Sequence, residues 1–61
     1  MNTQIEWLSP AQTGELLGVG VETLRRWRRH NIGPPARRVG PRFVRYDRAA
    51  VLTWLATRET A

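Results

Sequence analysis

The chain has 61 residues and a formal net charge of +5, with no cysteine and a single histidine, His30. A chain of this length holds one small core, so we expect residues 1–61 to form a single domain with an ordered part over about residues 7–57. The composition excludes a disulfide framework and a zinc site, and we expect no catalytic residues and no cofactor. No apolar run is long enough to span a membrane and no signal peptide opens the chain, which predicts a soluble cytoplasmic protein.

The basic residues are all arginines, ten in number, and most of them lie in two clusters, within residues 25–29 and residues 37–48. The planar guanidinium fork suits phosphates and guanine edges better than the point charge of lysine does. A small chain with this charge favours a polyanionic partner, most often nucleic acid. A solvated basic surface is the alternative, and composition alone does not decide between the two.

The first predicted helix begins at Ser9 and Pro10. Ser9 is expected to be the N-cap, Pro10 the first helical residue, and Gln12 the second half of a capping box. The helix is expected to end near Leu17, where Gly18 offers a left-handed C-terminal cap.

A second helix is predicted over about residues 21–30, after a very short turn. Gly20 is its expected cap, a weaker one than serine or aspartate. Two short helices joined by so tight a glycine-containing turn predict a helix-turn-helix.

The GPP segment at residues 33–35 ends the second helix and forces an extended exit. Residues 36–39 and 42–46 then predict two short strands around a turn at Gly40, forming a hairpin that carries basic side chains.

Val44 and Tyr46 share one face of the second strand, and we assign them to the core. Phe43, on the other face, remains the alternative core residue. Asp47 resembles the N-cap of a third helix. The buried stripe of that helix is expected to contain Val51, Trp54 and Leu55.

These elements predict a mainly α fold with a small β-hairpin, in the order helix, helix, hairpin, helix. This order is typical of a winged helix-turn-helix domain. The expected core consists of Leu8, Leu16, Leu17, Val19, Leu24, Trp27, Val44, Tyr46, Val51, Trp54 and Leu55.

The second helix has two chemically distinct faces, because a helix advances roughly 100° per residue. Its expected buried stripe consists of Val21, Leu24 and Trp27. The opposite face carries one carboxylate and two guanidiniums, those of Glu22, Arg26 and Arg29. Such a column can contact base edges in a major groove, with an arginine on guanine and the carboxylate on a cytosine amino group.

Each charged residue of this helix also has an explanation without a ligand. The helix dipole favours Glu22 in the first turn and cations in the last turn, and Glu22 and Arg26 can form an i,i+4 ion pair. Neither effect explains Arg25 and Arg26 at mid-helix, so we favour DNA binding by this face. Arg28 falls near the buried side and is expected to lay its aliphatic stem over the rim of the core.

The hairpin is the second candidate site. Arg37, Arg38 and Arg42 are expected to project around its tip, where an arginine can enter a minor groove or contact phosphates. Gly40 is needed for the turn in either case. The alternative is an exposed β-edge protected by charge, and this explanation is weakest for Arg42.

The tryptophans need no functional role. Trp27 and Trp54 fall on apolar stripes and are expected in the core. Trp7 is expected to pack beside Leu8 rather than to stack on a base.

From about Leu8 to Leu55 the chain resembles the excisionase, or recombination directionality factor, branch of the MerR-like winged-helix domains. The segments LLGV and VETLRRW, the GPP exit and the helix over residues 47–55 carry this resemblance. One departure is Gly14, in a position where the family commonly has alanine. This glycine either permits close helix packing or simply weakens the first helix.

The resemblance implies a recognition helix in the major groove and a wing beside it. Base-facing positions would be Glu22, Arg26 and Arg29, backbone-facing positions Thr23 and Arg25, and the wing residue Arg42. It further implies binding near phage attachment sites, often by several copies side by side, with bending of the DNA that directs an integrase toward excision. The implied partners are double-stranded DNA, an integrase and further copies of the chain, at the nucleoid in the cytoplasm of a bacterial host.

Other functions compete with this one. A small phage transcriptional regulator can use the same fold. About six residues follow Leu55, which disfavours a ligand-sensing activator with a long dimerisation helix. A module that docks an acidic protein is a third candidate. An enzyme is disfavoured, because Ser9, the only serine, is better used as a cap and no paired carboxylates or phosphate-binding glycine loop occur.

Overall fold

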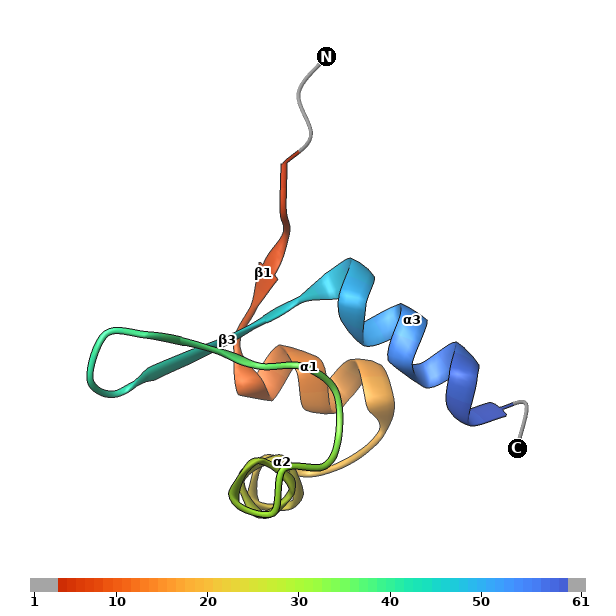
Figure 1. Cartoon of the computed structure of the whole chain (residues 1–61), viewed down its shortest axis with the longest axis horizontal. Coiled ribbons are helices and arrows are strands. Elements are labelled where there is room, and N and C mark those ends of the chain that lie inside the picture. The colour runs from red at the N-terminus through yellow and green to blue at the C-terminus, as the bar shows by residue number, and fades with distance from the viewer. Residues whose placement is uncertain (1–3, 60–61) are drawn as a thin grey trace.

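The computed structural model describes residues 4–59 and contains three helices and a three-stranded sheet. The elements in chain order are β1 (Trp7–Leu8), α1 (Pro10–Leu17), α2 (Val21–Arg29), β2 (Arg37–Val39), β3 (Phe43–Asp47) and α3 (Arg48–Glu59). The β2–β3 hairpin extends away from the helices, and α3 leads off in the opposite direction (Figure 1). The predicted winged helix-turn-helix fold is confirmed.

The sheet is antiparallel, with strand order β1-β3-β2. The N-terminal strand β1 is a finding that the sequence did not predict, because two residues are too short to show a period of two. Its Leu8 pairs with Tyr46. The hairpin strands are each displaced slightly from their predicted bounds, since the turn at Gly40 (φ 83°) extends through Arg42.

Both predicted helix caps of α1 are present. The Ser9 hydroxyl accepts from the backbone N–H of Gln12 at 3.1 Å, and the Gln12 side chain accepts from the backbone N–H of Ser9 at 2.9 Å. Gly18 ends the helix in the left-handed conformation, with φ 76°. The N-cap of α3 is confirmed too, because Asp47 Oδ1 accepts from the backbone N–H of Ala49 at 3.0 Å.

The core is small and centres on four buried side chains, Leu8, Leu24, Tyr46 and Val51. The residues packed against them, partly buried, are Leu17, Val19, Trp27 and Val44. Val44 and Tyr46 therefore face inward as predicted, and Phe43 is 58% exposed. Trp27 and Trp54 are half-buried and pack on each other, with ring centroids 5.7 Å apart.

Two burial predictions are wrong, that of Leu16 in the core and that of Val21 in the buried stripe of the second helix. Leu16 is 37% exposed, because α1 packs through Thr13, Gly14 and Leu17, and Leu16 lies roughly 110° around the helix from that face. Val21 is 42% exposed at the start of α2. It lines a hollow beside the hairpin instead of the core.

Thr13 takes the place at the core that Leu16 was expected to fill. It is fully buried, and its hydroxyl donates to the backbone carbonyl of Ser9 at 2.9 Å. This hydrogen bond satisfies the polar group and so allows threonine in the interior.

Gly14 permits close packing between α1 and the turn that leads to α2. A Cβ atom built at this position would lie 2.5 Å from the carbonyl oxygen of Val19. The same segment is held by Gly14 itself, whose carbonyl accepts the backbone N–H groups of Gly18 and Val19 at 2.7 and 2.9 Å. Of the two explanations for this glycine, the structure supports close packing.

Replacing Gly14 by alanine should destabilise the protein. The clash is with a backbone oxygen, which cannot rotate away as a side chain can, so we expect a loss of about 1–3 kcal/mol in the free energy of unfolding. Urea denaturation followed by tryptophan fluorescence measures this loss. Gly20→Ala is the control, because no atom other than those of its chain neighbours lies within 4 Å of its Cβ position, and its loss should stay below about 1 kcal/mol. A neutral or stabilising Gly14→Ala change would show instead that this glycine only weakens α1.

Candidate nucleic-acid interface

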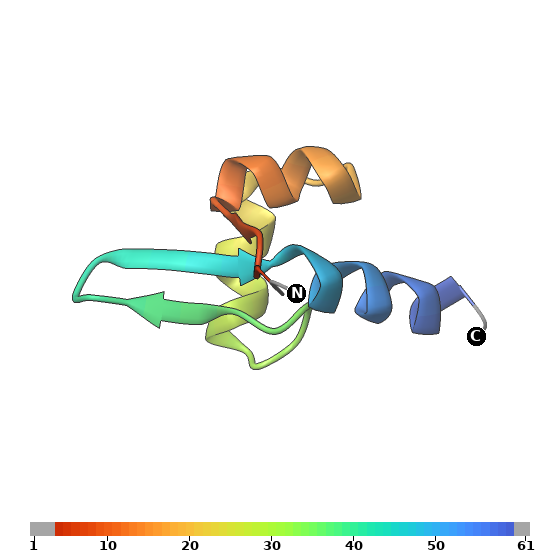
Figure 2. The same cartoon turned by 90° about the horizontal axis from the view of Figure 1, so that it is seen from above.

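The helix α2 is anchored by one face and exposed on the other. Leu24 is fully buried, and Trp27 packs against α3 through Trp54. The N-cap of α2 is Gly20, whose backbone carbonyl accepts from the N–H of Leu24 at 3.2 Å. Because glycine has no side chain, it supplies no side-chain hydrogen bond to the first turn. In space α2 lies to one side of the base of the hairpin, which extends past it (Figures 1 and 2).

The predicted base-facing column is exposed in the structure. Glu22, Arg26 and Arg29 are all solvent-exposed on the side of α2 away from Leu24. The i,i+4 ion pair between Glu22 and Arg26 does not form in the structure, where the one ion pair among the described side chains of residues 4–58 joins Arg48 to Glu6 at 4.0 Å. The charges of the column are therefore not neutralised by one another.

The two residues expected at the DNA backbone lie on opposite flanks of α2. Arg25 is exposed on the flank that faces the hairpin, where it lines two hollows together with hairpin arginines. Thr23 is half-buried on the other flank. Of Thr23 and Arg25, only Arg25 therefore lies near the hairpin.

The hairpin places its arginines on two different faces. Arg38 pairs in register with Val44 and so lies on the side of the sheet that faces α2. Arg42 is exposed in the turn, two residues after Gly40. Arg37 does not join them at the tip as predicted, because strand alternation turns it to the outer face.

Trp7 lies on the outer face of the sheet, where two arginines stack over aromatic rings. The guanidinium of Arg37 lies 5.8 Å from the centre of the Trp7 ring, and that of Arg45 lies 5.6 Å from the centre of the Phe43 ring. Trp7 is 40% exposed on the face opposite Leu8, so the expectation that it packs beside Leu8 is wrong. Neighbouring residues of a strand point to opposite faces, which separates Trp7 from Leu8.

Arg28 has a contact that the sequence did not reveal. Its stem is half-buried, as expected, and its Nη1 donates to the hydroxyl oxygen of Tyr46 at 3.3 Å. The two residues are 18 positions apart, so no local pattern signals the contact.

Four arginines line an open hollow of about 240 Å³ between α2 and β2, which we call the arginine cleft. Its residues are Arg25, Arg28, Arg29 and Arg38. A neighbouring hollow of about 260 Å³ continues along the hairpin and includes Arg42. None of these five guanidiniums is ion-paired within residues 4–59. The surface between helix and hairpin is strongly positive and open.

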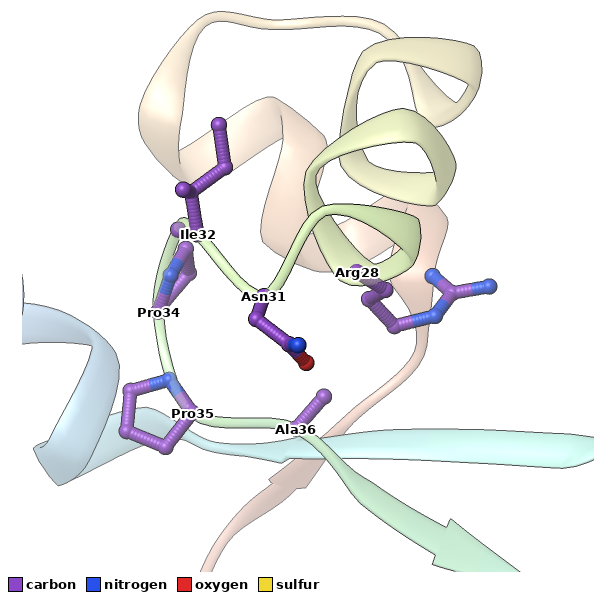
Figure 3. Close-up of a pocket in the computed structure, with 7 residues that line it drawn as sticks. Arg28, Asn31, Ile32, Pro34, Pro35 and Ala36 are labelled. Atoms are coloured by element: carbon purple, nitrogen blue, oxygen red, sulfur yellow. The ribbon is translucent and has the colours of Figure 1, made fainter.

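A further pocket of about 290 Å³ lies at the end of α2 and is lined by the following loop. Its Asn31 adopts a left-handed conformation with φ 59°, which asparagine tolerates. Figure 3 shows the Asn31 amide directed toward Ala36, while the guanidinium of Arg28 leads away from the loop. Arg28 is its only charged lining residue, so the pocket has no acid–base pair.

Residues 4–59 contain no group of three or more His, Cys, Asp or Glu side chains that could hold a metal ion. None of the helices in that range is both long and apolar enough to cross a membrane.

Comparison with known proteins agrees with the geometry. The family model described as a helix-turn-helix domain matches residues 7–59, which is nearly the whole chain. No curated protein matches the sequence. The match covers α1, α2, the hairpin and α3 together. The chain therefore belongs to the helix-turn-helix domain family and is a small DNA-binding protein of the helix-turn-helix type.

Proposed function

We propose that the protein is a non-catalytic architectural factor, an excisionase or recombination directionality factor of a phage. It binds attachment-site DNA, bends it and directs an integrase toward excision, with further copies bound alongside, at the nucleoid of a bacterial host. The observation that supports DNA docking is the exposed, unpaired column of Glu22, Arg26 and Arg29 beside a hairpin rich in arginine. The excision role rests on the sequence resemblance described above.

The docking we propose places α2 in the major groove. Arg26 or Arg29 donates to O6 and N7 of a guanine, and Glu22 accepts from a cytosine amino group. The backbone contacts come from Thr23 and Arg25. The wing contacts come from Arg38, Gly40 and Arg42, beside the major-groove site.

The bound sequence can be found by selection from random duplexes, followed by footprinting on the attachment region. Enrichment of one motif is expected, and probes with the motif at different positions should migrate differently because the DNA is bent. Recombination with the integrase of the same phage should then shift toward excision. If binding of the protein at this motif changes transcription but not excision, the protein is a transcriptional regulator instead.

The affinity should depend steeply on salt. Neutralising about four to six phosphates gives a slope of roughly −3.5 to −5.5 in a plot of log K against log salt concentration. Fluorescence anisotropy with the selected duplex measures this slope. Equal, weak binding to every duplex would contradict specific recognition, and a slope near zero would contradict a phosphate-binding surface.

Arg26→Ala and Arg42→Ala should have different effects. Loss of a guanine contact at Arg26 should cost about 1–3 kcal/mol on the preferred sequence and relax the preference at one base pair. Loss of a wing contact at Arg42 should weaken binding to all sequences and lower the salt slope by about 1. Competition binding with single-base variants of the site separates the two effects.

Arg58→Ala is the matched control, because it removes the same charge from α3, where Arg58 stacks 5.0 Å from the centre of the Trp54 ring. It should leave both sequence preference and slope nearly unchanged. If Arg26→Ala and Arg29→Ala both behave like Arg58→Ala, α2 does not contact bases in the proposed way.

A further inference from the structure

The arginine cleft brings four positive charges together with no carboxylate among them. Arg25, Arg28 and Arg29 come from α2, and Arg38 comes from β2 on the opposite wall. Within α2, arginines three and four residues apart repel each other. With none of the four ion-paired in residues 4–59, the repulsion is not relieved inside the described structure. The cleft therefore has the electrostatics of an anion-binding site.

The position of the cleft indicates which anion fits. Arg25 lies roughly 70° and Arg28 roughly 130° around α2 from the middle of the column of Glu22, Arg26 and Arg29, both on the same flank. When a helix occupies a major groove, the groups at its flank are the phosphates of the strand that borders the groove. Guanidinium forks bind phosphate oxygens through paired hydrogen bonds. A backbone phosphate thus matches both the charge and the location.

Tyr46 links this cleft to the core. Its side chain is 1% exposed on the central strand β3, between paired strands on both sides. Its hydroxyl accepts the hydrogen bond from Arg28 at 3.3 Å. A free arginine side chain samples many rotamers, and ordering it on binding lowers affinity. The contact with a rigid core residue limits that loss.

Given the DNA-binding role proposed above, on which this inference rests, we propose that the arginine cleft binds one backbone phosphate between α2 and β2. Arg28 and Arg38 contact this phosphate from the two walls of the cleft. Tyr46 is a positioning residue that holds Arg28 toward this phosphate. Arg28, which the sequence assigned only to the rim of the core, thereby becomes part of the DNA interface.

The test uses the full chain and the duplex selected from random DNA. A set of duplexes is made in which one phosphate at a time is replaced by a neutral methylphosphonate. Neutralising the phosphate in the cleft should weaken binding of the unsubstituted protein about tenfold or more, since hydrogen bonds between charged groups are lost.

Arg28→Met keeps an unbranched stem and removes the guanidinium. It should weaken binding to the natural duplex about tenfold and lower the salt slope by about 1, with no further loss on the duplex whose cleft phosphate is neutral. Arg38→Met should likewise weaken binding to the natural duplex and cause no further loss on the duplex with the same neutral phosphate. The control is Arg48→Met, which removes the same charge at a position that lines neither hollow. It should change affinity less than about threefold and stay additive with every methylphosphonate.

Tyr46→Phe separates positioning from folding. It should weaken binding to the natural duplex about three- to tenfold through the freed Arg28 side chain, but should not weaken binding to the duplex with the neutral cleft phosphate. A merely structural role of the hydroxyl would weaken binding to both duplexes equally, and that result would overturn the positioning role.

The two proposals fail in different ways. If no duplex is preferred, the proposed function fails. If a duplex is preferred but Arg28→Met and Arg38→Met remain additive with every methylphosphonate, the cleft binds no phosphate while the function stands. If Arg28→Met does not fold, as judged by circular dichroism, Arg38→Met and the methylphosphonate series on the unsubstituted protein decide the question.

Discussion

The close approach of Gly14 to the Val19 carbonyl is the constraint on which the rest of the structure depends. It brings the turn between the helices against α1, with the Gly14 carbonyl accepting from both Gly18 and Val19. Because this turn leads directly into α2, its position determines where Leu24 enters the core and which face of α2 is left exposed. A larger residue at position 14 would move the entire charged surface relative to the hairpin, and not only the first helix.

The protein combines a very small core with a strongly basic surface. Four buried hydrophobic residues hold together elements that carry closely spaced guanidiniums, one of them hydrogen-bonded to a core tyrosine. Like charges on one side of so small a domain destabilise the free protein. A polyanion relieves this repulsion, so that binding and folding stability are linked: a ligand that binds only the folded state also stabilises it.

Local signals predicted much of this fold. The capping box at Ser9, the left-handed Gly18 and the Asp47 cap depend on neighbours within a few residues, and all three are present. Features that depend on distant segments were missed. The strand β1 exists only through its pairing with β3, and Leu16 is exposed because Thr13 and Gly14, not apolar themselves, face the core.

The same division applies to the candidate site. A helical wheel was enough to identify Glu22, Arg26 and Arg29 as an exposed column, although their roles on DNA stay predictions. It could not show that Arg28 meets Tyr46, or that strand alternation sends Arg37 and Arg38 to opposite faces. Those relations arise only when β3 lies beside both α2 and β2.

The pairing of β1 with β3 also determines when during synthesis the core can close. Leu8 belongs to the core, and its strand partner is Tyr46, so Leu8 becomes buried only after a strand much later in the sequence has been made. A nascent chain can form α1 and its turn on the ribosome, because their contacts are local. It cannot close the sheet or bury Leu8 until β3 has left the exit tunnel. A nascent chain that has not yet formed β3 therefore presents the arginines of α2 without the scaffold that orders them.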